Sequence, residues 1–306
     1  MNEKNTSCWV LSEGIAGTEN QCIAVAEVLG SPFDVKRIKL QQPWKSLSPY
    51  IGFEQGWSFV PALRPPYPDL LIAAGRKSIA ASRYIKRASG GKTFTVQIQD
   101  PRISPKHFDL VAVPHHDPAR GDNIIVTDAA PNRVSSDGGR VTGDGFSELA
   151  ALPSPRVAVL LGGDSKAYRF DARAVAAQLS EVKGSLMITP SRRTGAENVA
   201  ILRDALPDAY IWGGAGENPY FAMLALADVI LVTADSASMI SDACSTGKPV
   251  YMIEMEGGHP RIDKLHKHLQ DIGALRRFEG NLEVYRYEPL NDAAKIARAI
   301  EERFKR

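Results

Sequence analysis

Short runs of apolar residues recur along the chain, and a polar turn and a segment with helical spacing follow most of them. The clearest case begins with Val229–Val232 and continues through the small-residue turn Thr233–Ser238. A helical segment, Met239–Ser245, comes next and stops before Gly247. A second apolar run follows at Val250–Ile253. Strand, turn, helix and strand in this order predict a βαβ unit with parallel strands.

The same pattern covers the whole chain and falls into two series. Buried strands are predicted at 8–11, 33–40, 69–74, 93–99, 108–113 and 123–126, and then at 156–161, 184–189, 210–212, 229–232 and 250–253. The stretch 135–154 between the series is rich in Gly, which predicts a linker. A length of 306 residues is also long for one hydrophobic core. We therefore predict an α/β protein with two Rossmann-like βα domains that face a cleft, divided near residue 150.

Polar residues follow the strands of the second series, and ligands bind at the carboxyl ends of parallel strands. The groups that suit a phosphate are Gly163, Ser191, Arg192, Arg193, Ser236, Ala237, Ser238 and Met239. Arg offers a fork of N–H donors to phosphate oxygens, and a helix N-terminus adds unpaired N–H groups and partial positive charge. The alternatives are that Asp235 or Ser236 only caps the helix and that the two arginines lie in a solvated loop.

The first series offers an acid or base at its strand ends. Asp100 follows one predicted strand, and His115-His116-Asp117 follows the next. Histidine titrates near neutral pH and is suited to general base catalysis. A turn-forming role is the alternative for each of these residues. We see no third or fourth ligand that would complete a metal site, so none is predicted.

Composition narrows the class of protein. Apolar residues make up 44% of the chain and the formal net charge is +2, which argues against a broad nucleic-acid surface. No apolar run approaches the roughly 20 residues that span a bilayer, and we recognise no secretion signal. Three cysteines without metal-type spacing, Cys8, Cys22 and Cys244, fit small apolar fillers in a reducing cytoplasm. We expect a cytoplasmic protein.

The segment 41–66 lacks clear periodicity and is rich in Pro and aromatic residues. Long segments of this kind are often functional, or they pack as a flap. We favour core packing for its aromatic side chains. Contact with lipid is the alternative, at the inner face of a membrane.

Seven segments carry a resemblance to a known family: WVLSEGIAGTENQ, PDLLIAAGR, VQIQDPR, FDLVAVPHHD, LLGGDS, ITPSRRTG and ADVILVTADSASMISDACSTGKPV. The last one resembles the donor-binding segment of the GT-B glycosyltransferases. Together the segments are similar, almost end to end, to bacterial relatives of the plant mitochondrial-fission ELM family. These relatives are often labelled nucleoside-diphosphate-sugar epimerases.

The resemblance implies a GT-B-type glycosyltransferase with a nucleotide-diphospho-sugar as donor substrate and no required cofactor or metal. Residues 1–150 would be the acceptor-side domain, 151–290 the nucleotide-sugar domain, and 291–306 a terminal helix that packs back on the first domain. Asp242 matches the acidic residue that holds the ribose, although Glu is commoner there; a surface ion pair is its alternative role. A glycan or lipid-linked acceptor is expected near Gly14, Gly17, Gln21, Arg76 and Arg102, with Asp100 or His116 as the base.

Three other functions stay open at this point. The family label suggests a nicotinamide-dependent epimerase, but the Gly14-x-x-Gly17 loop lacks the third glycine of such enzymes. No Tyr-x-x-x-Lys pair is found either. Plant members imply a non-catalytic adaptor that recruits a dynamin-type GTPase. A nucleotide-sugar hydrolase would share the same donor site.

Overall fold

The computed structural model describes residues 6–48, 50, 52–134 and 145–304. Contacts divide the chain into two compact units, Met1–Arg133 together with Asn291–Arg306, and Val134–Leu290. The division therefore falls between Arg133 and Val134, whereas the sequence analysis put it near residue 150. Much of the predicted linker, 135–144, lies outside the described residues.

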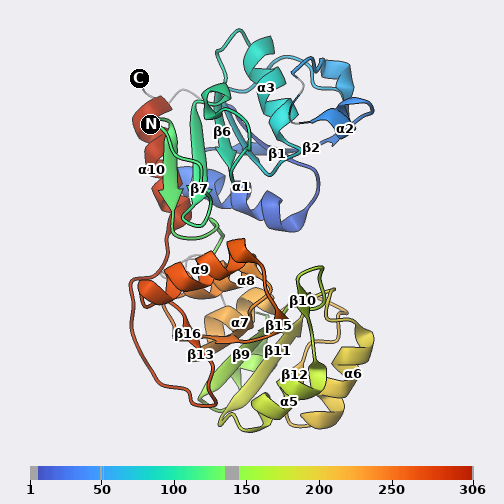
Figure 1. Cartoon of the computed structure of the whole chain (residues 1–306), viewed down its shortest axis with the longest axis vertical. Coiled ribbons are helices and arrows are strands. Elements are labelled where there is room, and N and C mark those ends of the chain that lie inside the picture. Colours follow the sequence, from blue (N-terminus) through green and yellow to red (C-terminus); the bar gives the residue numbers. More distant parts are fainter. Residues whose placement is uncertain (1–5, 49, 51, 135–144, 305–306) are drawn as a thin grey trace. The chain divides into compact units, whose positions relative to one another are not determined.

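The first unit is built on a six-stranded parallel sheet in the order β2-β1-β5-β6-β7-β8. The strands are β1 (Cys8–Ser12), β2 (Phe33–Arg37), β5 (Leu70–Ala74), β6 (Phe94–Ile98), β7 (Leu110–Pro114) and β8 (Ile124–Thr127). Helices α1 (Ala16–Leu29) and α10 (Asp292–Phe304) pack on one face, and α3 (Ile79–Ala88) packs on the other (Figure 1). Apolar strands such as β5 are buried throughout because both faces are covered.

Helix α10 joins the first unit although it lies at the far end of the chain. The Asp292 carboxylate accepts hydrogen bonds from the backbone N–H of Asp128 (2.9 Å) and of Ala129 (2.8 Å), just beyond β8. Ile296 and Ile300 are buried in the cluster that α1 and the sheet form. The ring of Phe304 meets Phe94 edge to face at 5.5 Å between centroids. These contacts fix the helix on the unit that the first 133 residues form.

The second unit carries another six-stranded parallel sheet, in the order β12-β11-β9-β13-β14-β16. Its strands are β9 (Arg156–Leu161), β11 (Ser185–Pro190), β12 (Tyr210–Ile211), β13 (Val229–Thr233), β14 (Val250–Ile253) and β16 (Arg276–Arg277). In chain order this is 3-2-1-4-5-6, the order of a dinucleotide-binding Rossmann fold. The strand order reverses between β9 and β13, where such folds bind ligands.

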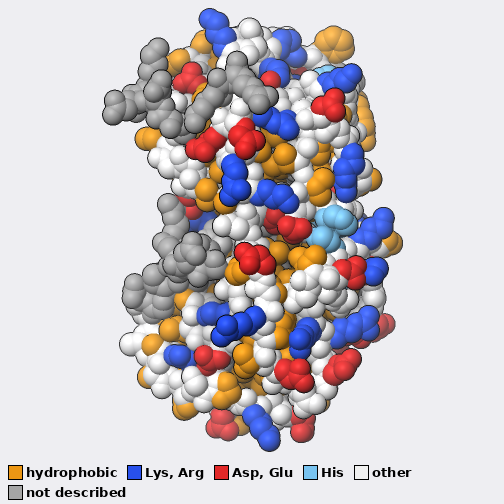
Figure 2. All heavy atoms as spheres, turned by 90° about the vertical axis from the view of Figure 1, so that its left-hand side faces the viewer, with side chains coloured by type: hydrophobic (Ala, Val, Ile, Leu, Met, Phe, Trp, Pro, Cys, Tyr) orange, Lys and Arg blue, Asp and Glu red, His pale blue; other side chains and the backbone are white. Residues whose placement is uncertain are grey.

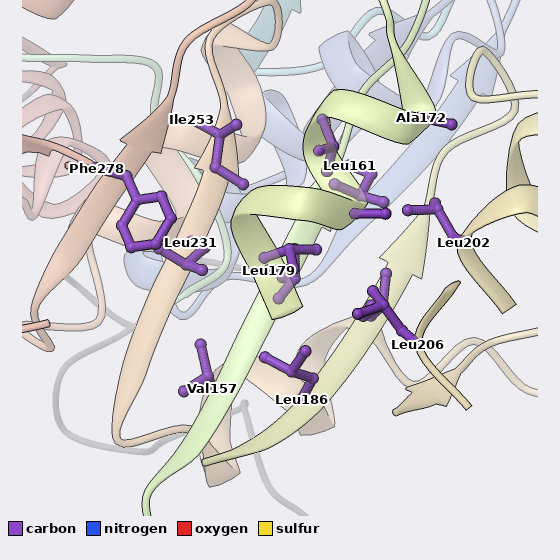
Figure 3. Packing of buried hydrophobic residues seen from close by; sticks show 14 of the residues in the cluster. Val157, Leu161, Ala172, Leu179, Leu186, Leu202, Leu206, Leu231, Ile253 and Phe278 are labelled. Carbon is purple, nitrogen blue, oxygen red and sulfur yellow. The ribbon is translucent and has the colours of Figure 1, made fainter. Parts of the chain in front are cut away.

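Helices cover both faces of this second sheet. They are α5 (Ala172–Ser180), α6 (Ala196–Ala205), α7 (Tyr220–Leu226), α8 (Ala237–Cys244) and α9 (Pro260–Asp271). Side chains of β9, β11, β13 and β14 meet the inner face of α5, with Leu179 lying among them (Figure 3). The strand and helix alternation predicted from the apolar pattern is confirmed in both units, and with it the α/β class.

Two predictions about local structure are wrong. The Gly14-x-x-Gly17 stretch was expected to form a loop, but α1 begins at Ala16, because Gly14 (φ +80°) already completes the turn and the Thr18 hydroxyl donates to the Ile15 carbonyl. The run 33–40 was expected to be one strand. It breaks at Ile38, and β3 (Lys39–Leu40) pairs instead with β4 (Phe59–Val60).

Short elements complete the two units. They are α2 (Trp44–Leu47), η1 (Gly56–Ser58), η2 (Pro105–His107), α4 (Ser147–Ala150), and a two-stranded pair of β10 (Tyr168–Arg169) with β15 (Glu256–Gly257). The three cysteines are buried and unpaired, as predicted. Within the described ranges, no helix has the length and apolar character needed to cross a membrane. Basic and acidic side chains are both scattered over the face drawn in Figure 2, among the atoms that it colours by type.

We predict that Ile296→Ala lowers the free energy of unfolding by about 2–5 kcal/mol, since it removes a fully buried side chain between α10 and α1. Glu302→Ala, an exposed position on the same helix, is the control and should change stability by less than about 0.5 kcal/mol. Urea denaturation measures both. Equal stability of the two variants would contradict the docking of α10.

Candidate functional site

Three neighbouring strands of the second unit, β11, β9 and β13, end at the same edge of the sheet. The loops that follow them begin at Gly162, Ser191 and Ala234. Because parallel strands lie about 4.8 Å apart, the three loops are brought within contact of one another. All the phosphate-suited residues predicted from the sequence belong to these loops or to the first turn of α8.

A buried carboxylate, that of Asp235, joins two of the loops. It accepts hydrogen bonds from the Gly163 N–H (3.1 Å) and from the Thr233 hydroxyl (2.7 Å). The Thr233 hydroxyl in turn accepts from the Gly162 N–H at 2.7 Å. Two backbone N–H groups at the end of β9 are therefore tied to side chains at the end of β13.

Arg193 brings the third loop into this network. Its guanidinium lies 2.6 Å from the Asp235 carboxylate and donates to the Gly163 carbonyl at 2.9 Å. The Asp235 side chain has no exposed surface, whereas 42% of the Arg193 side chain is exposed. A buried charge needs a partner, and Arg193 supplies it. The positive charge of Arg193 is thus largely offset within the protein.

The β11 loop is also held by hydroxyl groups. Ser191 Oγ donates to the Gly162 carbonyl at 2.8 Å, and the buried Thr194 hydroxyl donates to the same carbonyl. The Ser191 N–H reaches Thr194 Oγ1 at 2.9 Å. Ser191 was predicted to meet a phosphate, and in the structure its hydroxyl is engaged with the backbone of the β9 loop.

The loops are so close together at positions 162 and 163 that only glycine fits there. A Cβ on Gly162 would overlap the Asp235 carboxylate, and a Cβ on Gly163 would overlap the backbone of Arg193. Neither glycine has a positive φ. Close approach of side chain and backbone, rather than backbone conformation, therefore requires glycine at both positions.

The N-terminus of α8 lies next to this network. Ser236 is the N-cap, and its hydroxyl accepts from the Met239 N–H at 3.5 Å. The helix cap that we considered as an alternative is therefore present. The N–H groups of Ala237 and Ser238 belong to the first turn, where helical N–H groups have no acceptor within the helix. Ser238 is exposed, so this end of the helix is open to solvent.

Arg192 differs from its neighbour. It is exposed, and among the described residues it forms no hydrogen bond or ion pair. The alternative role considered for both arginines, a solvated position in a loop, therefore applies to Arg192 and not to Arg193. Its guanidinium keeps its full set of donors for an external group.

Asp242 lies one turn into α8 and is partly buried. Its carboxylate accepts a hydrogen bond from the Tyr220 hydroxyl of α7 at 2.7 Å. Burial raises the pKa of Asp242 to about 7, although the Tyr220 hydrogen bond favours the charged form. The partner of Asp242 is therefore a neutral phenol and not the cation of a surface ion pair.

The roles of Thr194, Thr233 and Tyr220, and that of Asp235 as the centre of the network, were not predicted from the sequence. A Thr-x-Asp at a strand end was a visible signal, since both side chains can accept from a neighbouring loop. Nothing in the sequence pattern indicated a role for His266 of α9. It is buried, interacts with the Ala234 carbonyl, and burial lowers its pKa.

In the first unit, several predicted residues also gather at the carboxyl edge of the sheet. The Gln99 side-chain amide donates to the Gln21 side chain at 3.1 Å, which links the β6 loop to α1. Gly14 lies in the turn before α1, and Gly17 lies inside that helix. Arg76 follows β5, donates to the Ser48 carbonyl at 3.3 Å and lies over the Tyr50 ring.

The two candidate bases follow neighbouring strands, β6 and β7. Asp100 Oδ1 accepts from the Arg102 N–H at 2.8 Å, and the Asp100 N–H points to Asp117 Oδ2 at 3.5 Å. Arg102 itself adopts φ +54° and is exposed. His116 is half-buried beside Asp117. Asp100 thus shapes its own loop, and the structure brings the His116 loop next to it.

No group of three or more His, Cys, Asp and Glu side chains that could hold a metal ion occurs in the part of the chain that the structure describes. The arrangement in the second unit instead offers N–H donors and an arginine.

A family model described as mitochondrial fission ELM1 matches residues 16–304. This chain belongs to the ELM1 family. It is 34% identical over 271 residues to mitochondrial fission protein ELM1 of Arabidopsis thaliana, which covers 76% of this chain. The match spans 63% of the plant protein, so that protein has further sequence outside it. An uncharacterized protein of Rickettsia prowazekii is 26% identical over 95% of this chain and 97% of its own length.

Solved structures similar to this ELM1-family chain are glycosyltransferases with the GT-B fold. The glycotransferase of kitacinnamycin aligns with a TM-score of 0.55 and 12% identity over 99% of this chain and 92% of its own. MurG of Acinetobacter baumannii aligns with 0.51 and 14% identity over 98% and 93%. Arabidopsis thaliana UGT89C1 complexed with UDP aligns with 0.51 and 12% identity over 99% and 91%. Identities this low show the fold alone.

We predict that Gly162→Ala lowers the free energy of unfolding by about 1–3 kcal/mol, because the added methyl overlaps the Asp235 carboxylate. Gly17→Ala is the matched control. It has open space around the added Cβ and lies in a helix, so stability should stay or rise by up to about 1 kcal/mol. Chemical denaturation measures the free energy of unfolding of both variants. Wild-type stability of Gly162→Ala would contradict the prediction and show that the network adjusts to the added methyl.

A second prediction concerns pH and Asp242. Its folded pKa, about 7, lies above the ordinary value near 4, so the folded state holds this proton more tightly than the unfolded chain. The stability that the neutral carboxyl provides is complete below about pH 4 and is lost as pH rises through 7. Asp242→Asn should therefore gain roughly 2 kcal/mol relative to wild type between pH 5.5 and pH 8.5.

Thermal unfolding of both proteins at the two pH values measures this difference. Asp208→Asn, which changes an exposed carboxylate of the same unit, is the control and should follow wild type. If Asp242→Asn also follows wild type, Asp242 is already ionised at pH 5.5.

Proposed function

We propose that this ELM1-family protein is a glycosyltransferase that takes a nucleotide-diphospho-sugar as donor. One observation carries the proposal: at the point where the strand order reverses, the loops after β11, β9 and β13 converge beside the open N-terminus of α8. Rossmann-type folds bind nucleotide phosphates at this point. The glycosyltransferase structures with the same fold support the choice of reaction class.

Charge supports a diphosphate as the anchoring group. The Asp235 carboxylate would repel a phosphate, but Arg193 neutralises it at 2.6 Å. The remaining attraction comes from the α8 N-terminus, from the exposed side of Arg193 and from Arg192. Fixed N–H dipoles and guanidinium groups stabilise a leaving diphosphate without a metal. We therefore propose metal-independent transfer.

In this proposal Asp242 accepts a hydrogen bond from a ribose hydroxyl. Tyr220 occupies Oδ2 of Asp242, at 2.7 Å, and no protein hydrogen bond is found to the other oxygen among the described residues. The hydroxyl of the acceptor attacks the anomeric carbon, the bond from that carbon to the phosphate oxygen breaks, and the nucleoside diphosphate leaves. The proton of the attacking hydroxyl passes to Asp100 or His116. The acceptor is proposed to bind through Gln21, Arg76 and Arg102 of the first unit.

A thermal-shift panel of UDP-, GDP-, ADP- and CMP-sugars tests the donor proposal. UDP-sugars come first, because UGT89C1 is complexed with UDP. A diphosphate donor should raise the melting temperature by several degrees, and a CMP-sugar, with one phosphate, by much less. EDTA should leave the shift unchanged.

The variant that tests the site is Arg192→Ala, which should weaken binding of the best donor about tenfold, as loss of one charge-assisted contact does. Lys183→Ala removes an exposed cation at the opposite end of the same sheet and is the matched control. No shift with any nucleotide sugar would overturn the proposal in favour of a non-catalytic interaction protein. Bound NAD would indicate an epimerase, and release of free sugar without an acceptor a hydrolase.

A further inference from the structure

The first unit exposes large apolar side chains along one short segment. Among the described residues, nine large hydrophobic side chains are exposed, and five of them lie between positions 47 and 60. They are Leu47 (42% exposed), Tyr50 (68%), Phe53 (80%), Trp57 (62%) and Val60 (52%). We call these five side chains the aromatic patch. Core packing, which we favoured for this segment, is therefore wrong for Tyr50, Phe53 and Trp57 and right for Phe59, which is buried.

The backbone beneath the aromatic patch is held firmly. Glu54 is buried and forms an ion pair with Arg83 of α3 at 2.5 Å. Arg87 of the same helix donates to the carbonyls of Gly52 (3.1 Å) and Glu54 (2.5 Å). In Figure 1 this segment and its helix α2 lie beside α3. The exposed side chains are thus presented by an anchored segment.

Fixed packing also holds the far side of the segment. Trp57 meets Trp44 edge to face at 4.8 Å between ring centroids. Gly56 leaves no room for a Cβ against the Leu63 carbonyl and the Tyr84 hydroxyl. These contacts fix the backbone and leave the rings exposed to water. An exposed apolar patch of this kind marks an interaction site.

Within the segment that carries the aromatic patch, the exposed charges have one sign. Between positions 39 and 64 the basic residues are Lys39, Lys45 and Arg64, all exposed, and the acidic residue is Glu54. Glu54 is buried against Arg83, so it offers no charge to a partner. Arg76 adds a cation over the Tyr50 ring, 5.7 Å from its centroid. A partner for this surface must be apolar and anionic.

We propose that the aromatic patch binds the surface of an anionic lipid bilayer. Trp and Tyr rings favour the level of the lipid headgroups, and Phe and Leu enter the acyl boundary. Lys and Arg beside them attract acidic headgroups. None of the five side chains lines the cavity of about 670 Å³ at the β2 edge of the unit, so the aromatic patch is separate from that cavity. The inference does not rest on the donor site.

Vesicle flotation tests the proposal with the full chain. The vesicles are pure phosphatidylcholine or a mixture with about one third phosphatidylglycerol. Wild type should float with the mixed vesicles, at least tenfold more than with phosphatidylcholine alone, and should be released by 0.5 M salt. Failure of wild type to bind mixed vesicles overturns the proposal.

Two pairs of variants separate the parts of the surface. Phe53→Ser with Trp57→Ser should abolish flotation, and Val284→Ser, which changes a side chain 85% exposed in the second unit, should not. Lys39→Gln with Lys45→Gln should lower binding several-fold, against Lys183→Gln as control. Phe53→Ser alone leaves the Trp57–Trp44 contact intact, so it should lower flotation at the melting temperature of wild type. Full binding by the aromatic double variant would overturn the proposal and leave the patch to a protein partner.

Discussion

The second unit depends on one buried carboxylate. Asp235 has no exposed side-chain surface, yet it carries a charge that Gly163 of the β9 loop, Thr233 at the end of β13 and Arg193 of the β11 loop stabilise. Removing any one partner would leave a buried charge partly unsatisfied, which costs several kcal/mol. The loops after β9, β11 and β13 are therefore fixed relative to one another, and the N-terminus of α8 is fixed with them.

This network also limits what a ligand can use. Ser191 and most of Arg193 are committed to the protein itself. In the proposed donor site, what remains for an anion is Arg192, the exposed side of Arg193 and the first N–H groups of α8. At that proposed site, recognition of a nucleotide by so few groups would rely on their fixed positions more than on their number. Gly162 and Gly163 allow the loops to approach this closely, because larger residues at either position would push the loops apart.

The first unit shows a different relation between packing and surface. Phe59 and Trp57 are two positions apart, and one is buried while the other is 62% exposed. Composition could not distinguish them, because an aromatic residue fits a core and a membrane interface equally well. The distinction comes from α3, whose Arg83 and Arg87 hold the segment so that some rings face inward and others face water.

The sequence by itself determined the alternation of strands and helices, both parallel sheets and the loops in which the candidate site lies. It did so because apolar runs of strand length and Gly or Ser turns report on local backbone preference. Only the tertiary structure decided the partners within those loops: that Arg193 pairs with Asp235, that Asp242 meets Tyr220, and that Arg192 is exposed and forms no hydrogen bond or ion pair with the described residues. Arg193 and Asp235 lie 42 positions apart and Gly163 and Asp235 lie 72 apart, and no local pattern records which residues the sheet will bring together.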